Sequence, residues 1–167
     1  ESMPLVNRGR VEVTGGSLRW LGGGSASGRF VLADSASMSL PGGVYQLGGS
    51  VWEGTGPVRL GGSPAARLTV QGAFTAANFG FSGGTIDGDF EVQGGFEWSA
   101  GTLVNGRLRL GAGQHRIVGP DAKELLNAHF ENAGQLNFSG AAVGLRLSGF
   151  QQSITVTNDV GGVWSWT

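Results

Sequence analysis

The amino-acid sequence predicts an all-β protein, a β-solenoid of roughly seven or eight short-stranded coils if each repeat takes about 20 residues. Three observations lead to this prediction: a high glycine content, alternation of apolar and polar residues, and phrases that recur along the chain. Glycine accounts for 33 of the 167 residues, about three times its ordinary share. Because 40% of the chain is hydrophobic, we interpret the glycines as turns between many short strands rather than as a sign of disorder.

One phrase occurs twice in the middle of the chain, as FGFSGGTIDGDFEV and as FEWSAGTLVNGRLRL. The two copies cover residues 79–92 and 96–110, and every apolar position matches once one residue is inserted before Gly106. Each copy reads as short strands with period-two alternation, separated by glycine-rich corners. A strand with one apolar face cannot bury that face alone, so the repeat predicts units that stack on one another.

A second phrase links the two ends of the chain, since residues 7–18 match residues 132–143. Looser copies of the first phrase start at Leu18 and at Tyr45. The copies start at irregular intervals, which suits a solenoid with corners of varying length better than a propeller with fixed blades.

Helical periodicity is nearly absent from the sequence. The one stretch where we expect it is PDAKELLNAHF, in which Pro120 and Asp121 precede AKELL and can start a single helical turn. The sequence therefore predicts mostly strand, with helix confined to about residues 121–126.

The stretches LVNRGRVEVTGGSLRW, FEWSAGTLVNGRLRL and LLNAHFENAGQLNFSGA resemble the degenerate repeats of bacterial filamentous-haemagglutinin-like and adhesin-like β-solenoid exoproteins. The resemblance covers most of residues 5–166. It implies a right-handed parallel β-helix in an extracellular or bacterial cell-surface setting, and it identifies no ligand or catalytic residue. We expect residues 1–167 to form a single β-solenoid domain, a fragment of a larger surface protein, with residues 1–3 as a cloning remnant.

Composition excludes several classes of partner and site. The net charge is −1 and the 11 Lys and Arg residues are scattered, so the sequence offers no polybasic surface and we expect no nucleic-acid partner. With no cysteine, neither a disulfide framework nor a thiolate metal site is possible. No apolar run approaches the ~18 residues that a membrane span needs, and we expect no membrane insertion by this segment.

Trp98 is the residue for which a core role and a ligand-binding role compete most directly. A ligand platform would not need large apolar residues at the equivalent place in every other copy, whereas an inward stack of side chains would. We therefore predict that Trp98 lies in the core. The aligned positions hold Phe81, Phe138, Val13, Trp20 and Leu47.

The other candidate tryptophans are less settled. Trp52 follows Val51 and so falls on the opposite phase of the alternation. Trp164 and Trp166 either begin another coil or cap the preceding one. Whether Trp52, Trp164 or Trp166 contacts a ligand stays open at this stage.

Charged residues alternate with the apolar ones in the clearest repeat. The alignment places Asp89 opposite Arg107 and Glu91 opposite Arg109, and we predict that all four point to solvent. Asp87, Asp89 and Glu91 raise the alternative of a calcium site, but the stretch lacks the glycine spacing of the calcium-binding nonapeptide repeat. His115 and His129 have no partner at metal-ligand spacing, and we expect both to lie outward or at turns. We assign no catalytic, cofactor-binding or metal-binding residue.

The function favoured by these observations is non-catalytic: a rigid stalk or an adhesion and binding module of a bacterial cell-surface or secreted protein. Its expected partners are the remainder of its own chain and a surface protein or glycan of a host or neighbouring cell. One alternative is a polysaccharide-degrading or polysaccharide-binding β-helix domain, because fold alone does not separate these functions. Another is a segment of a trimeric fibre, from a phage tail or a secreted adhesin.

Overall fold

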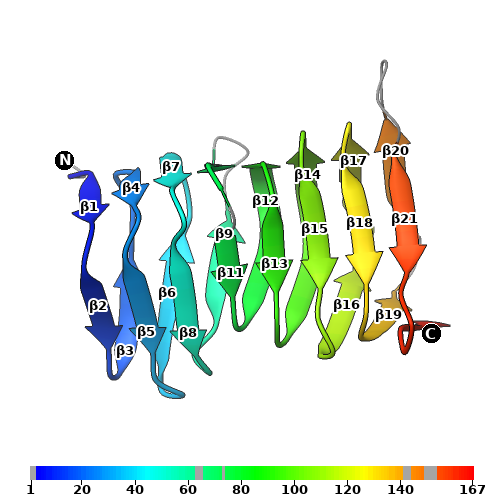
Figure 1. Cartoon of the computed structure of the whole chain (residues 1–167), viewed down its shortest axis with the longest axis horizontal. Coiled ribbons are helices and arrows are strands. Elements are labelled where there is room, and N and C mark those ends of the chain that lie inside the picture. The colour runs from blue at the N-terminus through cyan, green and yellow to red at the C-terminus, as the bar shows by residue number, and fades with distance from the viewer. Residues whose placement is uncertain (1–2, 63–65, 73, 141–143, 149–153) are drawn as a thin grey trace.

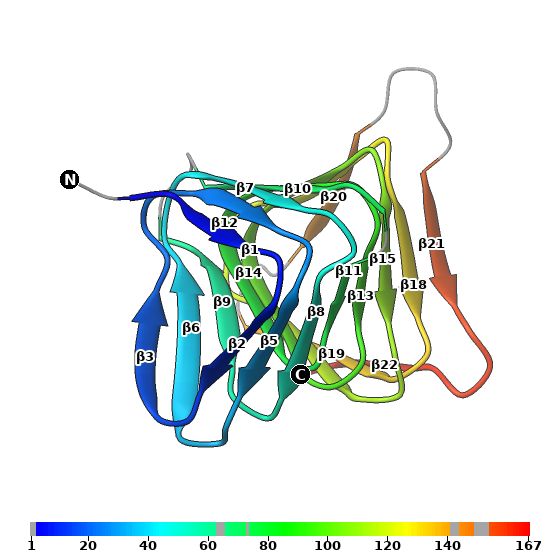
Figure 2. The same cartoon turned by 60° about the vertical axis from the view of Figure 1, so that its left-hand side comes forward.

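Parallel strands wind into a solenoid of about seven turns in the computed structural model (Figures 1 and 2). The structure describes residues 3–62, 66–72, 74–140, 144–148 and 154–167, so residues 1–2 of the expected cloning remnant lie outside it. In Figure 1 the front strands run downwards while the chain advances from left to right, which makes the solenoid right-handed. The described residues contain no helix. The predicted all-β, right-handed parallel β-helix is confirmed.

Each coil contributes one strand to each of three faces, which we name A, B and C. Face A contains β1 (Leu5–Asn7), β4 (Gly24–Ala26), β7 (Val44–Leu47), β10 (Arg67–Val70), the C-terminal halves of β12 (Phe79–Asp87) and β14 (Phe96–Val104), β17 (Lys123–Leu126) and β20 (Leu145–Ser148). Face B contains β2 (Arg10–Val13), β5 (Arg29–Leu32), β8 (Val51–Gly54), β11 (Phe74–Ala76), β13 (Phe90–Val92), β15 (Arg107–Leu110), β18 (His129–Asn132) and β21 (Thr155–Asn158). Face C contains β3 (Gly16–Arg19), β6 (Ala36–Leu40), β9 (Val58–Gly61), the N-terminal halves of β12 and β14, β16 (Gln114–Val118), β19 (Gln135–Ser139) and β22 (Val163–Trp166).

The repeated phrase at the centre of the chain corresponds to β12 and β14, two long strands that each turn from face C to face A. Glycines with positive φ allow this turn, Gly84 at 88° and Gly101 at 110°. The strands lie side by side as the sequence alignment predicted, and their register joins Phe79 to Phe96, Phe81 to Trp98, and Ile86 to Leu103.

The second phrase describes a shared corner rather than a pair of stacked strands. Its first copy turns from face A to face B at Asn7, and its second turns from face B to face C at Asn132. In both corners the amide N–H two residues later donates to the asparagine Oδ1, at 3.0 Å from Gly9 and 3.3 Å from Gly134. Residues 141–143, which end the second copy, lie outside the described residues.

Trp98 lies in the core, as predicted, with 0% of its surface exposed. Its ring stacks on that of Phe81 at a centroid distance of 5.7 Å, and its Nε1 donates to the carbonyl oxygen of Ala100 at 3.1 Å. The same inward column on face C continues through Ile117 to Phe138. The ligand-platform interpretation of Trp98 is therefore excluded by burial.

Trp52 is also buried, at 2% exposure, although it falls on the opposite phase to Trp98 in the sequence. It lies on face B, where its register partner is the buried Phe30. Each corner resets the alternation, so phase cannot be carried from one face to the next. Trp164 and Trp166 belong to β22 and so form part of a further coil rather than a cap.

The helical turn expected near residues 121–126 is wrong. Residues Lys123–Leu126 form β17, which pairs in parallel with β14. Lys123 and Leu125 both point inward, because the period of KELL here is two. Stacking on β14 outweighs the helix propensity of a four-residue stretch.

Replacing Trp98 by Ala should lower the free energy of unfolding by ~3–5 kcal/mol, because it leaves a large cavity in a closed column. Arg109→Ala, on the outer surface of the neighbouring coil, should change it by no more than ~1 kcal/mol. Chemical denaturation of both variants provides the measurement. Equal effects of the two substitutions would contradict the assignment of Trp98 to the core.

Gly106→Ala should destabilise the protein by ~1–3 kcal/mol, since an added Cβ would overlap the carbonyl oxygen of Gly88 in the coil below. Gly9→Ala is the matched control, because a Cβ there meets no atom within 4 Å. Thermal unfolding of both variants tests whether close coil-on-coil approach, rather than loss of glycine itself, has this cost. A Gly9→Ala protein as unstable as the Gly106→Ala protein would refute it.

Candidate functional site

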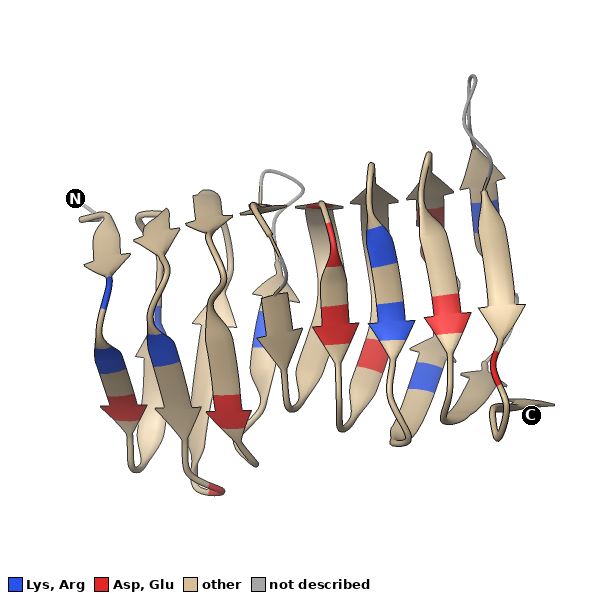
Figure 3. Ribbon diagram, viewed as in Figure 1, with Lys and Arg blue, Asp and Glu red and all other residues tan. Residues whose placement is uncertain are grey.

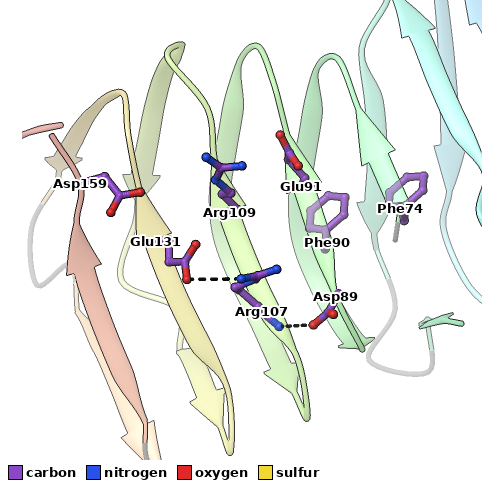
Figure 4. Close-up of a pocket in the computed structure, with 8 residues that line it drawn as sticks. All are labelled: Phe74, Asp89, Phe90, Glu91, Arg107, Arg109, Glu131 and Asp159. Carbon is purple, nitrogen blue, oxygen red and sulfur yellow. Dashed lines mark hydrogen bonds and ion pairs between the residues drawn. The ribbon is translucent and has the colours of Figure 1, made fainter. Parts of the chain in front are cut away.

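A charged hollow of about 320 Å³ lies on the outer surface of face B, over β11, β13, β15, β18 and the residue that follows β21 (Figure 4). Phe74 and Phe90 lie beneath it and contribute to the buried core. The charged residues that line it are Asp89, Glu91, Arg107, Arg109, Glu131 and Asp159.

Strand stacking produces the pattern of charge in this hollow. The register of face B aligns Glu91 with Arg109 and Arg109 with Glu131, so a guanidinium lies between two carboxylates in one row. Figure 3 shows this order as acidic, basic and acidic bands on successive strands. The predicted opposition of Glu91 and Arg109, and their outward direction, are confirmed.

The second predicted pair has a different geometry from a direct ion pair. Asp89 Oδ1 accepts a hydrogen bond from the main-chain N–H of Arg107 at 3.0 Å. The Arg107 guanidinium instead pairs diagonally with Glu131, at 3.8 Å between Nη1 and Oε1. Both interactions join neighbouring coils across solvent-accessible surface, where an ion pair contributes about 0–1 kcal/mol.

The three acids considered as a calcium site do not converge. Asp87 lies at the end of β12 on face A, where it forms an ion pair with Arg67 and accepts a hydrogen bond from Asn105 Nδ2 at 3.3 Å. Asp89 and Glu91 lie beyond the next corner, on face B. Within the described part of the chain, no three His, Asp or Glu residues are grouped so as to hold a metal ion.

Both carboxylate and guanidinium groups are available for polar contacts in the hollow. Glycoside hydrolases place two carboxyl groups on either side of the scissile bond, with room for water or substrate between them. Here the aligned carboxylates, Glu91 and Glu131, have Arg109 between them. Guanidinium and carboxylate groups form strong charge-assisted hydrogen bonds to a partner's polar groups.

His115 is buried, so the expectation that it lies outward or at a turn is wrong. It is 1% exposed and points inward from β16, in register between Phe96 and Leu136. Its Nε2 lies 2.8 Å from the carbonyl oxygen of Gly111, and its Nδ1 has no hydrogen-bond partner among the described residues. Burial lowers the pKa of His115. Alternation with the inward Ile117 is the sequence signal that could have placed it.

His129 lies in the outward phase of β18, as expected, with its Nδ1 2.5 Å from Thr155 Oγ1. Lys123 is a buried cation that sequence reasoning did not identify. Its Nζ donates to the carbonyl oxygens of Gly119 at 2.6 Å and Asp121 at 2.7 Å. Burial lowers the pKa of Lys123 as well. These hydrogen bonds tie Lys123 to the corner between β16 and β17.

No known protein-family model, curated protein or solved structure matches this chain. No helix that is long and apolar enough to cross a membrane occurs in the described ranges.

Stability should fall as the pH drops from 7 to 5, because His115 binds a proton more readily in the unfolded chain than in the folded one. The folded-state pKa of His115 is lowered. The stability that neutral His115 contributes is therefore fully present above the unfolded-state pKa of ~6.5 and is lost as the pH falls through the folded-state pKa. Denaturation at several pH values should show a smaller dependence for His115→Leu. A pH profile unchanged by His115→Leu would contradict this expectation.

Proposed function

We propose that this chain is a non-catalytic β-solenoid segment of a bacterial cell-surface or secreted protein, acting as a rigid stalk that also offers a contact surface. The observation that supports the stalk role most directly is the continuity of the apolar interior. Inward columns run through successive coils on all three faces, so each coil is held by those on either side. Such a column resists bending while each coil adds about 4.8 Å of length.

The contact surface is the charged hollow on face B. Its six charged residues come from four successive coils, so a partner lying along the solenoid can engage several coils at once. Polar groups of this kind suit hydroxyl-rich glycans or the polar surface of another protein. Binding is favoured over glycan cleavage because Arg109 separates the carboxylates of Glu91 and Glu131.

Incubation with a panel of acidic and neutral glycans should release neither reducing ends nor unsaturated products. Release of either product by the wild type, and its loss in Glu91→Gln or Glu131→Gln, would overturn the non-catalytic assignment and favour the polysaccharide-degrading alternative.

A binding panel of glycans and cell-surface proteins tests the contact role. Arg109→Ala should weaken a detected interaction by about tenfold, because it removes charge-assisted hydrogen bonds. Arg29→Ala is the matched control, since Arg29 lies on face B outside the hollow. Equal weakening by both variants would place the contact elsewhere.

A further inference from the structure

A second hollow, of about 380 Å³, lies on the outer surface of face C and shares no lining residue with the charged hollow on face B. It extends over β9, the N-terminal halves of β12 and β14, and β16. We name it the Gly80 notch, because Gly80 lies in its floor. The polar side chains that line the notch are those of Thr55, Arg59, Asn78, Glu97, Gln114 and Arg116.

The strand register of face C explains where the notch lies. One outward row runs along successive coils through Arg59, Gly80, Glu97 and Arg116. Figure 3 shows the charged bands of this row on the rear strands, with no band on the adjoining part of β12. Arg59 and Glu97 are two strand spacings apart, roughly 9–10 Å between their backbones. Because Gly80 has no side chain, the position between them is unfilled.

Neither backbone conformation nor packing requires a glycine at position 80. Within the described strands, Gly80 is the one glycine whose φ is not positive. An added Cβ would meet Cγ of the flexible Arg59 side chain at 3.2 Å, and no backbone atom closer than 3.7 Å. Glycine in the interior of a strand weakens it and often marks a place where a ligand approaches the backbone closely. Close approach of a ligand accounts for this glycine.

The two sides of the notch carry opposite charges. On one side, Arg59 forms no ion pair with any described residue, so its guanidinium donors are available. On the other side, Glu97 pairs with Arg116 at 3.7 Å between Oε2 and Nη1. A carboxylate has about four acceptor sites, so this single ion pair leaves Glu97 able to accept further hydrogen bonds. A ligand that fills the gap must therefore present an anionic acceptor to Arg59 and donors to Glu97.

We propose that the Gly80 notch binds a carboxylated sugar residue, a uronic acid, within an acidic glycan. The sugar carboxylate pairs with the Arg59 guanidinium, in the bidentate geometry that arginine forms with carboxylates. The sugar hydroxyls donate to Glu97, and the ring lies over the backbone of Gly80. An acidic peptide matches the notch less well, because its carboxylate side chain supplies no donor to Glu97. The proposal rests neither on the stalk role nor on the hollow of face B.

Titration calorimetry of the whole chain with defined oligosaccharides tests the proposal. The carboxylated probes are fragments of hyaluronan, alginate and polygalacturonate, and the neutral probes are fragments of chitin and cellulose. At least one carboxylated probe should bind, and the neutral probes should not. Arg59→Gln should weaken this binding by at least about tenfold, because it removes a charge-assisted pair. Arg19→Gln is the matched control, since Arg19 is an outward cation on face C outside the notch, and it should bind like the wild type.

Gly80→Thr provides a second test that leaves every charged group in place. The threonine side chain fills the gap between Arg59 and Glu97, so binding of the carboxylated probe should be lost. The unfolding temperature should be no lower than that of the wild type, because threonine favours strands more than glycine does. Ser39→Thr is the matched control: Ser39 lies on the other side of Arg59 in the same row and outside the notch, so binding should be unchanged.

Several results would overturn the proposal: no binding of any carboxylated probe, equal binding of the neutral probes, or binding that survives in Gly80→Thr. Binding of a hexaglutamate peptide through Arg59, without binding of the saccharides, would overturn the assignment to a sugar. Arg109→Ala separates this site from the hollow on face B and should leave binding at the notch unchanged. Saccharide binding that is lost in Arg109→Ala but kept in Gly80→Thr would support the hollow on face B and refute the Gly80 notch.

Discussion

The packing of inward side chains between successive coils is the interaction on which the rest of this structure depends. No single coil has an interior of its own, because its strands present their apolar residues to a space that is closed only by the neighbouring coils. Trp98 illustrates this dependence, since its ring is covered by Phe81 from the coil before and by Ile117 from the coil after. The hydrogen bonds between strands follow from the same stacking, as all of them join one coil to the next.

This constraint determines where other residue types are tolerated. Corners must bring the backbones of adjacent coils close together, and at Gly106 a side chain would overlap the coil below. Charged residues are largely confined to the outer surface, where stacking aligns them in rows such as Glu91, Arg109 and Glu131. The hollow on face B is thus a consequence of coil stacking.

The sequence predicted the fold and the clearest copies of the internal repeat. Apolar residues alternate within each strand, and the two copies of the clearest phrase correspond to equivalent parts of neighbouring coils. It was less informative wherever a corner intervened. Trp52 and Lys123 point inward although phase or helix propensity suggested otherwise, since each corner restarts the alternation. Within one strand, where phase is preserved, the same reasoning would have placed His115 correctly.

The candidate site was predicted only in part, for a related reason. The alignment of residues 79–92 with 96–110 placed Glu91 beside Arg109, because these coils have similar sequences. Glu131 and Asp159 come from later coils of different length, so their approach to the same hollow depends on corner lengths that the sequence pattern does not specify.

Native-state hydrogen exchange across the chain is the most direct measurement of the central claim. If coil-on-coil packing holds the structure together, backbone amides of β12 and β14 should exchange slowest, and protection should decrease towards β1–β3 and β20–β22. Fast exchange in β12 and β14, or protection that does not vary along the solenoid, would contradict the account.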